Sequence, residues 1–322
     1  MCTALRLTTT SGSVVHARTM DFADETASDV VVVPRGYALM SMAPPGEPGM
    51  TWTSAYAALG VNTHGLPLLI DGLNEKGLAV SALYHPDCAT YQRVDADDAA
   101  RTLAPLDVPV WLLTRFANAD AAAEGLRDVR VAASVFEPWG FVPPLHYVLH
   151  DAEQRCIVVE FIDRELIVHD NPLGVVTNAP EFAWHLRHFQ HYVDLNSTAA
   201  GRFMLGLPGD ATPSSRFVRA VALSQAAPPV DTVEEAVQQA FHILAACEIP
   251  RGVARSCDGE RVYCDYTQYT SAIDTTTRCL YFHTYGNRRV RMVDLMKMTL
   301  DAPTLTVFPM DRHEDVQELI TP

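Results

Sequence analysis

The sequence has few basic residues and no long hydrophobic run. Lysine and arginine number 24 against 39 acidic residues, giving a formal net charge of -15 over 322 residues. Nucleic-acid binding needs a basic surface, so this balance argues against nucleic acid and anionic membranes as partners. No stretch approaches the roughly 20 apolar residues of a membrane-spanning helix. No signal-peptide pattern is visible, so we expect a cytoplasmic protein, with a processed periplasmic form as the alternative.

The seven cysteines lack the pattern of a disulfide scaffold or a metal site. An odd number in a long chain is not typical of a disulfide framework. Cys156 and Cys279 lie inside apolar runs, which indicates buried thiols. Cys257 and Cys264 do not have zinc-knuckle spacing, and no histidine pair accompanies them. We therefore expect no metal ion and no other cofactor.

Hydrophobic residues make up 48% of the chain, which is enough for a large core. β-rich runs joined by short turns predict antiparallel strands at 2–10, 13–22, 29–36, 55–62, 77–84, 145–180, 266–285 and 289–295. Helical periodicity predicts helices within 108–129, 182–195, 214–227 and 232–247. The order of these elements favours one α+β domain over residues 1–322, with layered antiparallel sheets covered by helices. The segment 43–50, rich in proline and glycine, is predicted to be a surface loop.

The chain opens with Met1-Cys2 and a predicted hairpin. A tight turn with Ser11-Gly12 at its centre would set Cys2 opposite Asp21. In that register Arg18 has the opposite parity and faces away from Cys2. Pattern alone thus predicts a carboxylate beside the second residue.

An N-terminal cysteine carries its own base. Removal of Met1 would leave the Cys2 amine, of pKa near 8, beside a thiol of pKa about 8.5. Such an amine can take the thiol proton, as it does for N-terminal threonine nucleophiles. Asp21 could hold the amine and Arg18 could stabilise the thiolate. The alternative, a structural or incidental cysteine, stays open on this pattern alone.

Several motifs together resemble the choloylglycine hydrolase family, which contains bile salt hydrolases and penicillin V acylases. They occur in the family's order from Cys2 to about residue 296: MCTALRL, ARTMDF, DGLNEKGLAVSALY, VVTNAP, LPGDATPSSRFVRA and YTQYTSAID followed by CLYFHTYGN. The resemblance implies an N-terminal nucleophile (Ntn) hydrolase with a four-layer αββα sandwich of two antiparallel sheets between helix layers. It also implies an amidase that cleaves a linear carboxamide of a small N-acyl compound.

The resemblance assigns roles to particular residues. Cys2, once unmasked, attacks the carboxamide, and Arg18 and Asp21 flank its thiol and amine. Asn178 of VVTNAP donates to the oxyanion, and Arg216 of SSRFVR completes the site. From their own context, Asn178 could equally be a turn residue and Arg216 a salt-bridge partner.

Other residues bear on the substrate. The family position that is asparagine in typical bile salt hydrolases is Tyr84 here, and its backbone N–H would be the second oxyanion donor. Penicillin V acylases can carry tyrosine there, so we predict a penicillin V acylase-like amidase. A conjugated bile salt hydrolase, an N-acyl homoserine lactone acylase and a non-catalytic binding relative are the alternatives. Met20 and Phe22 border the acyl pocket by resemblance, and Phe141 either lines it or anchors the core.

Two further features complete the expectations. The loop before LPGD is short, which leaves a dimer or a tetramer as the predicted homo-oligomer. His185, His188 and His191 lie on one side of a predicted helix and are expected to be partly exposed. Because no G-x-S-x-G motif is present, they are not assigned to a serine triad.

Overall fold

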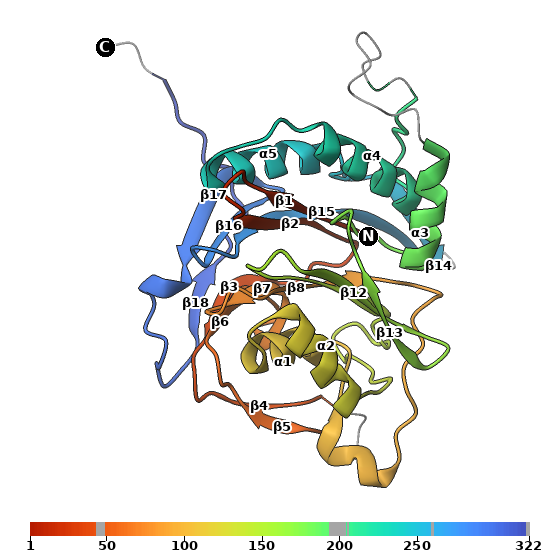
Figure 1. The fold of residues 1–322 in the computed structure, drawn as a ribbon, viewed down its shortest axis with the longest axis vertical. Coiled ribbons are helices and arrows are strands. Elements are labelled where there is room, and N and C mark those ends of the chain that lie inside the picture. Colours follow the sequence, from red (N-terminus) through yellow and green to blue (C-terminus); the bar gives the residue numbers. More distant parts are fainter. Residues whose placement is uncertain (43–48, 193–203, 205, 259–260, 320–322) are drawn as a thin grey trace.

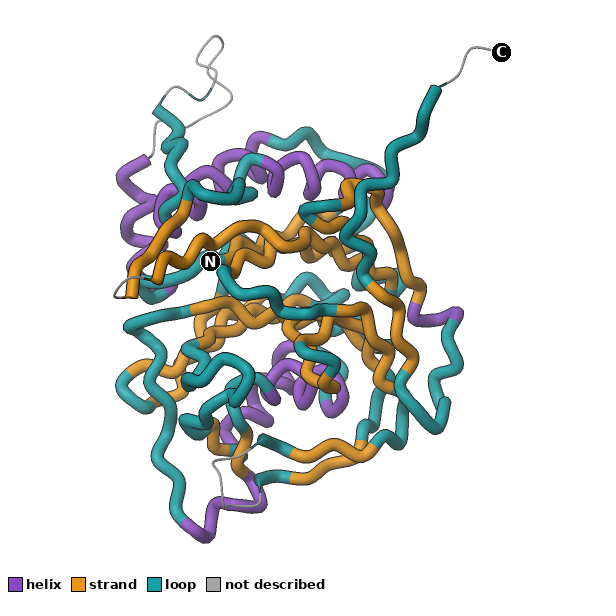
Figure 2. The backbone as a smooth tube through the Cα atoms, turned by 180° about the vertical axis from the view of Figure 1, so that it is seen from behind, coloured by secondary structure: helices purple, strands orange, loops and turns teal. Residues whose placement is uncertain are grey.

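Two antiparallel sheets lie face to face between layers of helices in the computed structural model (Figure 1). Figure 2 shows the same layers from behind, with helices on the outer side of each sheet. The predicted αββα sandwich is therefore confirmed. The structure describes every residue except 43–48, 193–203, 205, 259–260 and 320–322.

The first sheet carries the N-terminal hairpin. Its strands are ordered β1 (Cys2–Thr8), β2 (Val14–Phe22), β15 (Arg261–Asp274), β16 (Cys279–Thr284) and β17 (Asn287–Asp294), with β14 (Ala254–Asp258) paired to β15. Every residue of β2 is buried. A strand covered on both faces needs no alternation of polar and apolar residues, because helices pack on one side and the second sheet on the other.

The second sheet has more strands than the first and forms the other inner layer. Its order is β13 (Glu165–Asp170), β12 (Cys156–Ile162), β11 (Leu145–His150), β8 (Ala79–Tyr84), β7 (Leu66–Asn74), β6 (Ala58–Thr63), β3 (Asp29–Val33) and β18 (Thr306–Pro309). Neighbouring strands in this order run antiparallel, as the short turns of the sequence predict. Short strands outside the two sheets pair β4 (Ala38–Met40) with β5 (Thr51–Thr53) and β9 (Thr102–Leu103) with β10 (Arg130–Val131).

Helices cover the outer faces. They are α1 (Asp107–Arg115), α2 (Ala119–Asp128), α3 (Phe182–Phe189), α4 (Pro213–Ala226) and α5 (Val233–Ala245), with 3-10 turns at Ala96–Arg101, Gln190–Tyr192 and Leu295–Lys297. Helices α4 and α5 contact β1, β2 and β15, whereas α1 contacts β7 and β8. The helix predicted within 232–247 is α5, and a capping box of Thr232 and Glu235 begins it.

The helix predicted within 108–129 is two helices. The two helices are separated near Asn118. Its side chain accepts a hydrogen bond from the Ala121 N–H and so caps the start of α2. The helix predicted within 182–195 ends at Phe189, and the rest of that range passes into a 3-10 turn and then out of the described residues. Most of the predicted loop 43–50, and the short loop before LPGD, also lie outside the described residues.

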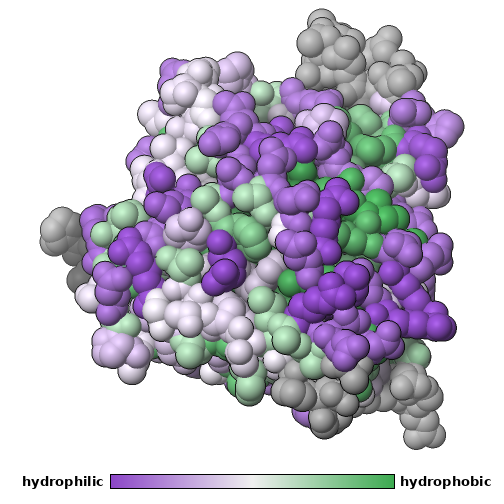
Figure 3. Space-filling model, turned by 60° about the horizontal axis from the view of Figure 1, so that its bottom comes forward, coloured by the Kyte–Doolittle hydropathy of each residue, from purple (hydrophilic) through white to green (hydrophobic). Residues whose placement is uncertain are grey.

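Two hydrophobic cores follow from this layering. One lies around the first sheet and includes Cys2 and Leu5, and the other lies between the second sheet and α1 and includes Trp111. In the described part of the chain, no helix is both long and apolar enough to cross a membrane. The face in Figure 3 shows hydrophobic patches interrupted by hydrophilic residues.

Candidate active site

The register of the first hairpin differs by one residue from the prediction. Cys2 pairs with Met20 and not with Asp21. The loop has three residues rather than two, because Gly12 adopts a left-handed φ of 90° at its last position and Thr9 N–H donates to Ser13 O. A three-residue loop ending in a left-handed glycine is a standard hairpin connection. The extra loop residue moves every partner along β2 by one position.

The shifted register puts Arg18 on the same sheet face as Cys2. Ala4 pairs with Arg18, two residues from the Cys2–Met20 pair, so the prediction that Arg18 faces away is wrong. The Arg18 Nη2 lies 2.9 Å from the Cys2 Sγ, and its Nη1 donates to the carbonyl of Ala82 at 2.8 Å. The Met20 Sδ lies 4.0 Å from the same thiol. A fully buried cation is therefore in direct contact with the sulfur.

Asp21 lies on the opposite face of β2. Its carboxylate accepts hydrogen bonds from the hydroxyls of Thr19, at 3.1 Å, and Thr267, at 2.5 Å. Complete burial raises the pKa of Asp21, and the positive charge of Arg216 opposes that shift. The Asp21 side chain therefore does not face Cys2 across the hairpin.

Asn178 connects the hairpin to the second sheet. It lies just after Val176, which pairs with Ala4 of β1. Its Oδ1 accepts from the Cys2 N–H and from Arg216 Nη2, both at 2.7 Å. Two donors on one atom identify that atom as the oxygen, so Nδ2 is the atom that donates to Tyr84 O at 2.6 Å. One N–H of the amide remains for a further acceptor.

Arg216 closes the site from the helix side. It lies in the first turn of α4 and is completely buried. Its Nη1 donates to the Cys2 carbonyl and, at 2.7 Å, to the Thr3 hydroxyl. Burial lowers the pKa of Arg216, while the nearby Asp21 acts in the opposite sense. The guanidinium therefore fixes both Cys2 and Asn178.

The predicted pocket residues form an aromatic group beside this centre. The ring of Phe22 lies 5.7 Å from that of Tyr84 and 4.8 Å from that of Trp139. Trp139 in turn stacks on Phe141 at 5.8 Å. Tyr84 ends β8, and because the His85 N–H donates toward β11, the Tyr84 N–H points to the other side of the strand. Phe22 thus joins the hairpin to the loop that carries Phe141.

Met1 continues the hairpin beyond Cys2. Its amine donates to the Asp21 carbonyl, and the Asp21 N–H donates to the Met1 carbonyl at 2.9 Å. With Met1 attached, the nitrogen of Cys2 is a peptide nitrogen and has no basic lone pair. Met1 also lines a cavity of about 800 Å³ together with Thr212, Arg219 and Asp265. Loss of Met1 would extend that cavity toward Cys2.

Sequence reasoning missed the residues behind Asn178. His185 was expected to be partly exposed, but it is buried, and its Nε2 lies 2.8 Å from the carbonyl of Asn178. His188 is half-buried and His191 is exposed. Helical spacing placed the three histidines on one side of a helix, but it could not show that the first one faces α4. The ring of Phe217 stacks on His185 at 5.0 Å and defines its orientation.

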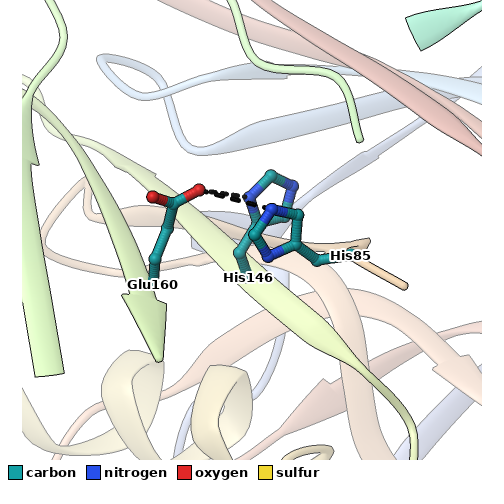
Figure 4. Close-up of side chains that lie close together, drawn as sticks. All are labelled: His85, His146 and Glu160. Atoms are coloured by element: carbon teal, nitrogen blue, oxygen red, sulfur yellow. Dashed lines mark hydrogen bonds and ion pairs between the residues drawn. The ribbon is translucent and has the colours of Figure 1, made fainter. Parts of the chain in front are cut away.

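A second buried cluster has the residue types of a metal site. His85, His146 and Glu160 bring their ligand atoms within 4.8 Å of one another (Figure 4). The two imidazole rings are stacked, with centroids 4.2 Å apart and planes 3° from parallel. A histidine binds a metal through a lone pair in its ring plane, and two stacked parallel rings cannot direct both lone pairs at one ion. We therefore interpret the cluster as a hydrogen-bonded group.

Comparison with known proteins agrees with this geometry. The family profile of linear amide C–N hydrolases, choloylglycine hydrolase family, matches residues 2–308. A bile salt hydrolase/transferase from Lactiplantibacillus plantarum is 30% identical over 96% of this chain and 97% of its own length. A penicillin V acylase from Pectobacterium atrosepticum is 27% identical over 64% of this chain and 54% of its own length.

Solved structures match over nearly the whole chain. A conjugated bile acid hydrolase from Clostridium perfringens superposes with a TM-score of 0.86 at 27% identity, covering 99% of this chain and all (100%) of its own. A penicillin V acylase from Agrobacterium tumefaciens has the same fold, with a TM-score of 0.81 at 24% identity over 96% of this chain and 91% of its own.

Proposed function

This chain belongs to the choloylglycine hydrolase family of linear amide C–N hydrolases, and we propose that it cleaves small N-acyl amides with Cys2 as the nucleophile. The observation that carries the proposal is the contact of 2.9 Å between Arg18 Nη2 and the Cys2 Sγ. A thiolate is the reactive form of cysteine, and a neighbouring cation favours it. The proposal treats residues 1–322 as one domain, because both sheets supply residues of the site.

The base in this proposal is the amine of Cys2 itself. After Met1 is removed, the free amine takes the proton of the thiol, and the thiolate attacks the carbonyl carbon of the substrate. The same amine then gives the proton to the leaving nitrogen, and water hydrolyses the thioester. Because Arg18 and Arg216 are both close to Cys2, their charges favour the neutral, basic form of that amine.

Asn178 and Tyr84 supply the oxyanion donors in this proposal. The remaining N–H of the Asn178 amide and the backbone N–H of Tyr84 are the groups assigned to the developing negative charge. Donors that are already fixed act strongly because they need no reorganisation during the reaction. The bonds of Asn178 to Cys2, Arg216 and Tyr84 supply that fixation.

The acyl group is assigned to the aromatic residues beside Cys2. Met20, Phe22, Tyr84 and Phe141 offer an apolar surface next to the thiol, which suits the phenoxyacyl group of penicillin V. Tyr84 in place of the asparagine of typical bile salt hydrolases supports this choice. Conjugated bile salts are the second candidate, favoured by the relative at 30% identity over 96% of the chain.

Self-association completes the proposal. We assign the protein as a homo-oligomer, either a dimer or a tetramer. Val290 and Met292 on β17 are exposed at 48% and 46%, and association would remove such apolar surface from water. Light scattering coupled to size-exclusion chromatography measures the state directly.

Parallel hydrolysis assays test the activity. Penicillin V, glycocholate and a C10 acyl homoserine lactone are compared at equal enzyme concentration, with Cys2→Ala as the control. We expect the highest kcat/KM on penicillin V, no turnover by Cys2→Ala, and a mass that shows loss of Met1. Active enzyme that retains Met1, or an active Cys2→Ala variant, would refute the mechanism. A preference for glycocholate would overturn only the assignment of the acyl group.

A further inference from the structure

The segment that carries Asn178 is buried but has no regular secondary structure. Thr177 and Asn178 are 0% and 2% exposed, and the residues between Val176 and α3 belong to no strand or helix. Backbone carbonyls in such a segment lack the partners that a sheet or helix would supply. Because a buried carbonyl without a donor is costly, side chains must satisfy it.

Histidine rings from two elements supply those donors. His146 Nε2 of β11 lies 3.0 Å from the Thr177 carbonyl. His185 Nε2 of α3 lies 2.8 Å from the Asn178 carbonyl. A carbonyl can only accept, so each ring nitrogen donates. The two rings thus hold consecutive residues of the segment. His146 precedes the segment in the sequence and His185 follows it.

Glu160 of β12 contacts one of these rings and the start of α3. Its Oε1 lies 3.3 Å from Nδ1 of His146, and it also accepts from the Phe182 N–H at 2.9 Å. His146 thus has the Thr177 carbonyl at Nε2 and the Glu160 carboxylate at Nδ1. Burial would raise the pKa of Glu160, but the hydrogen bonds from His146 and His169 hold it well below its usual range.

We propose that His146, His185 and Glu160 form a histidine clamp that positions Asn178 for oxyanion stabilisation. This inference rests on the proposed function, since it needs Asn178 as a donor. The histidines contact backbone carbonyls of the segment, whereas Cys2 contacts the Asn178 side chain, so they act through Asn178 and not on the substrate. They are positioning residues in this role.

The clamp matters because the donor geometry is tight. The side chain of Asn178 has contacts of 2.6 to 2.7 Å to Tyr84, Cys2 and Arg216. A small shift of its backbone would move the remaining N–H away from the oxyanion. Misplacement by about 1 Å can cost on the order of 100-fold in rate, so a partial loss of the clamp is expected to cost about 10-fold.

Ring-preserving substitutions test the clamp. His185→Phe and His146→Phe remove the donor while keeping an aromatic ring, and the first keeps a ring that can stack on Phe217. The matched control is His150→Phe. His150 is also completely buried on β11, but its Nε2 contacts the Cys156 thiol at 2.9 Å and not the segment. Melting temperatures are measured for all variants.

The expected result is specific to Asn178. Each clamp variant lowers kcat about 10-fold with KM within about 2-fold, whereas His150→Phe stays within about 2-fold in both. In an Asn178→Ala background, the clamp variants should lower kcat by less than about 2-fold further, because the group they position is gone. Equal losses in both backgrounds would overturn the clamp.

A second readout does not depend on turnover. Hydrogen exchange of the peptide 176–182 should be faster in His185→Phe than in His150→Phe, and equal exchange would also overturn the clamp. His185→Gln, which retains an N–H donor, should recover at least half of the lost rate if His185→Phe folds poorly. An active Cys2→Ala variant would instead refute the proposed function, and the exchange measurement would still decide the clamp.

Discussion

Two buried carboxylates on facing sheets have pKa values shifted in opposite directions. Asp21 of the first sheet and Glu160 of the second are both completely buried. Asp21 receives hydroxyl hydrogen bonds from Thr19 and Thr267, and burial raises its pKa. For Glu160, burial acts in the same direction, but its imidazole donors outweigh it and lower its pKa.

The difference shows that burial alone does not set the charge of a carboxyl group. Hydroxyl donors are neutral and can reverse their hydrogen bonds, so they tolerate a protonated or an ionised acid. The Phe182 backbone N–H, which donates to Glu160, cannot reverse in this way. Glu160 is therefore held as the anion, while Asp21, beside the proposed nucleophile, is free to exist in either form.

The largest expected effect comes from neutralising the two carboxylates. Glu160→Gln should lower the free energy of unfolding at pH 7 by about 3–5 kcal/mol, because it removes the buried negative charge on which the hydrogen bonds of His146, His169 and the Phe182 N–H converge. Asp21→Asn should change that free energy by less than about 1 kcal/mol, because Thr19 and Thr267 can rotate to accept from an amide. Urea denaturation of both variants measures the contrast.

Equal losses in the two variants would contradict the contrast. A Glu160→Gln variant as stable as the wild type would also contradict it. Because Glu160 has a lowered pKa, its contribution is present above the unfolded pKa and is lost as pH falls below that value. The difference between Glu160→Gln and the wild type should therefore shrink below about pH 4, which urea curves at low pH would show.

The next effect concerns catalysis at the junction of the two sheets. Asn178→Ala should lower kcat by about 10²–10³, or about 3–4 kcal/mol, with little change in KM. In the proposed mechanism, ground-state binding barely uses the donor, whereas the tetrahedral intermediate needs it. Steady-state kinetics on the best substrate measure both constants. An unchanged kcat would leave Asn178 with a structural role alone.

The sequence predicted the layers well because periodicity and turns are local signals. The capping box at Thr232 and the strand runs need no knowledge of distant residues. The predicted register of the first hairpin was wrong, and the reason is local as well. Ser11-Gly12 suits a two-residue turn, but Gly12 is equally suited to end a three-residue loop, and the two choices put opposite faces of β2 beside Cys2.

The site was harder to predict than the fold. Motif resemblance named Arg18, Asn178 and Arg216, and the structure brings all three into contact with Cys2. Their roles in catalysis remain the proposal made above. No motif pointed to Glu160 or His146, because their partners lie on other strands and on an irregular segment. Such contacts depend on tertiary packing, which spacing along one strand does not encode.

A smaller effect should appear in acid. Burial lowers the pKa of His85 to about 3, and its neighbour His146 adds to this shift. The unfolded chain binds a proton on this ring below about pH 6.5, and the folded protein does not, so stability is lost as pH falls from 6.5 toward 3. His85→Gln should reduce the loss between pH 7 and pH 5 by about 2 kcal/mol. Urea denaturation at both pH values measures it, and an unchanged difference would show that His85 does not carry the effect.

The smallest effect is expected at Tyr84, which lies between the two regions. Its carbonyl accepts from Asn178, and the next residue, His85, stacks on His146. Tyr84→Asn keeps the backbone donor and acceptor but removes the ring that contacts Phe22. We expect kcat to fall by less than about 10-fold, since the oxyanion donors stay in place. The ratio of kcat/KM for penicillin V to that for glycocholate should fall, because the apolar surface beside the thiol is reduced. Tyr84→Phe is the matched control, because it keeps the ring and should keep the ratio. If Tyr84→Asn lost as much kcat as Asn178→Ala, the side chain would be part of the oxyanion machinery, and the assignment of the backbone N–H as the donor would be wrong.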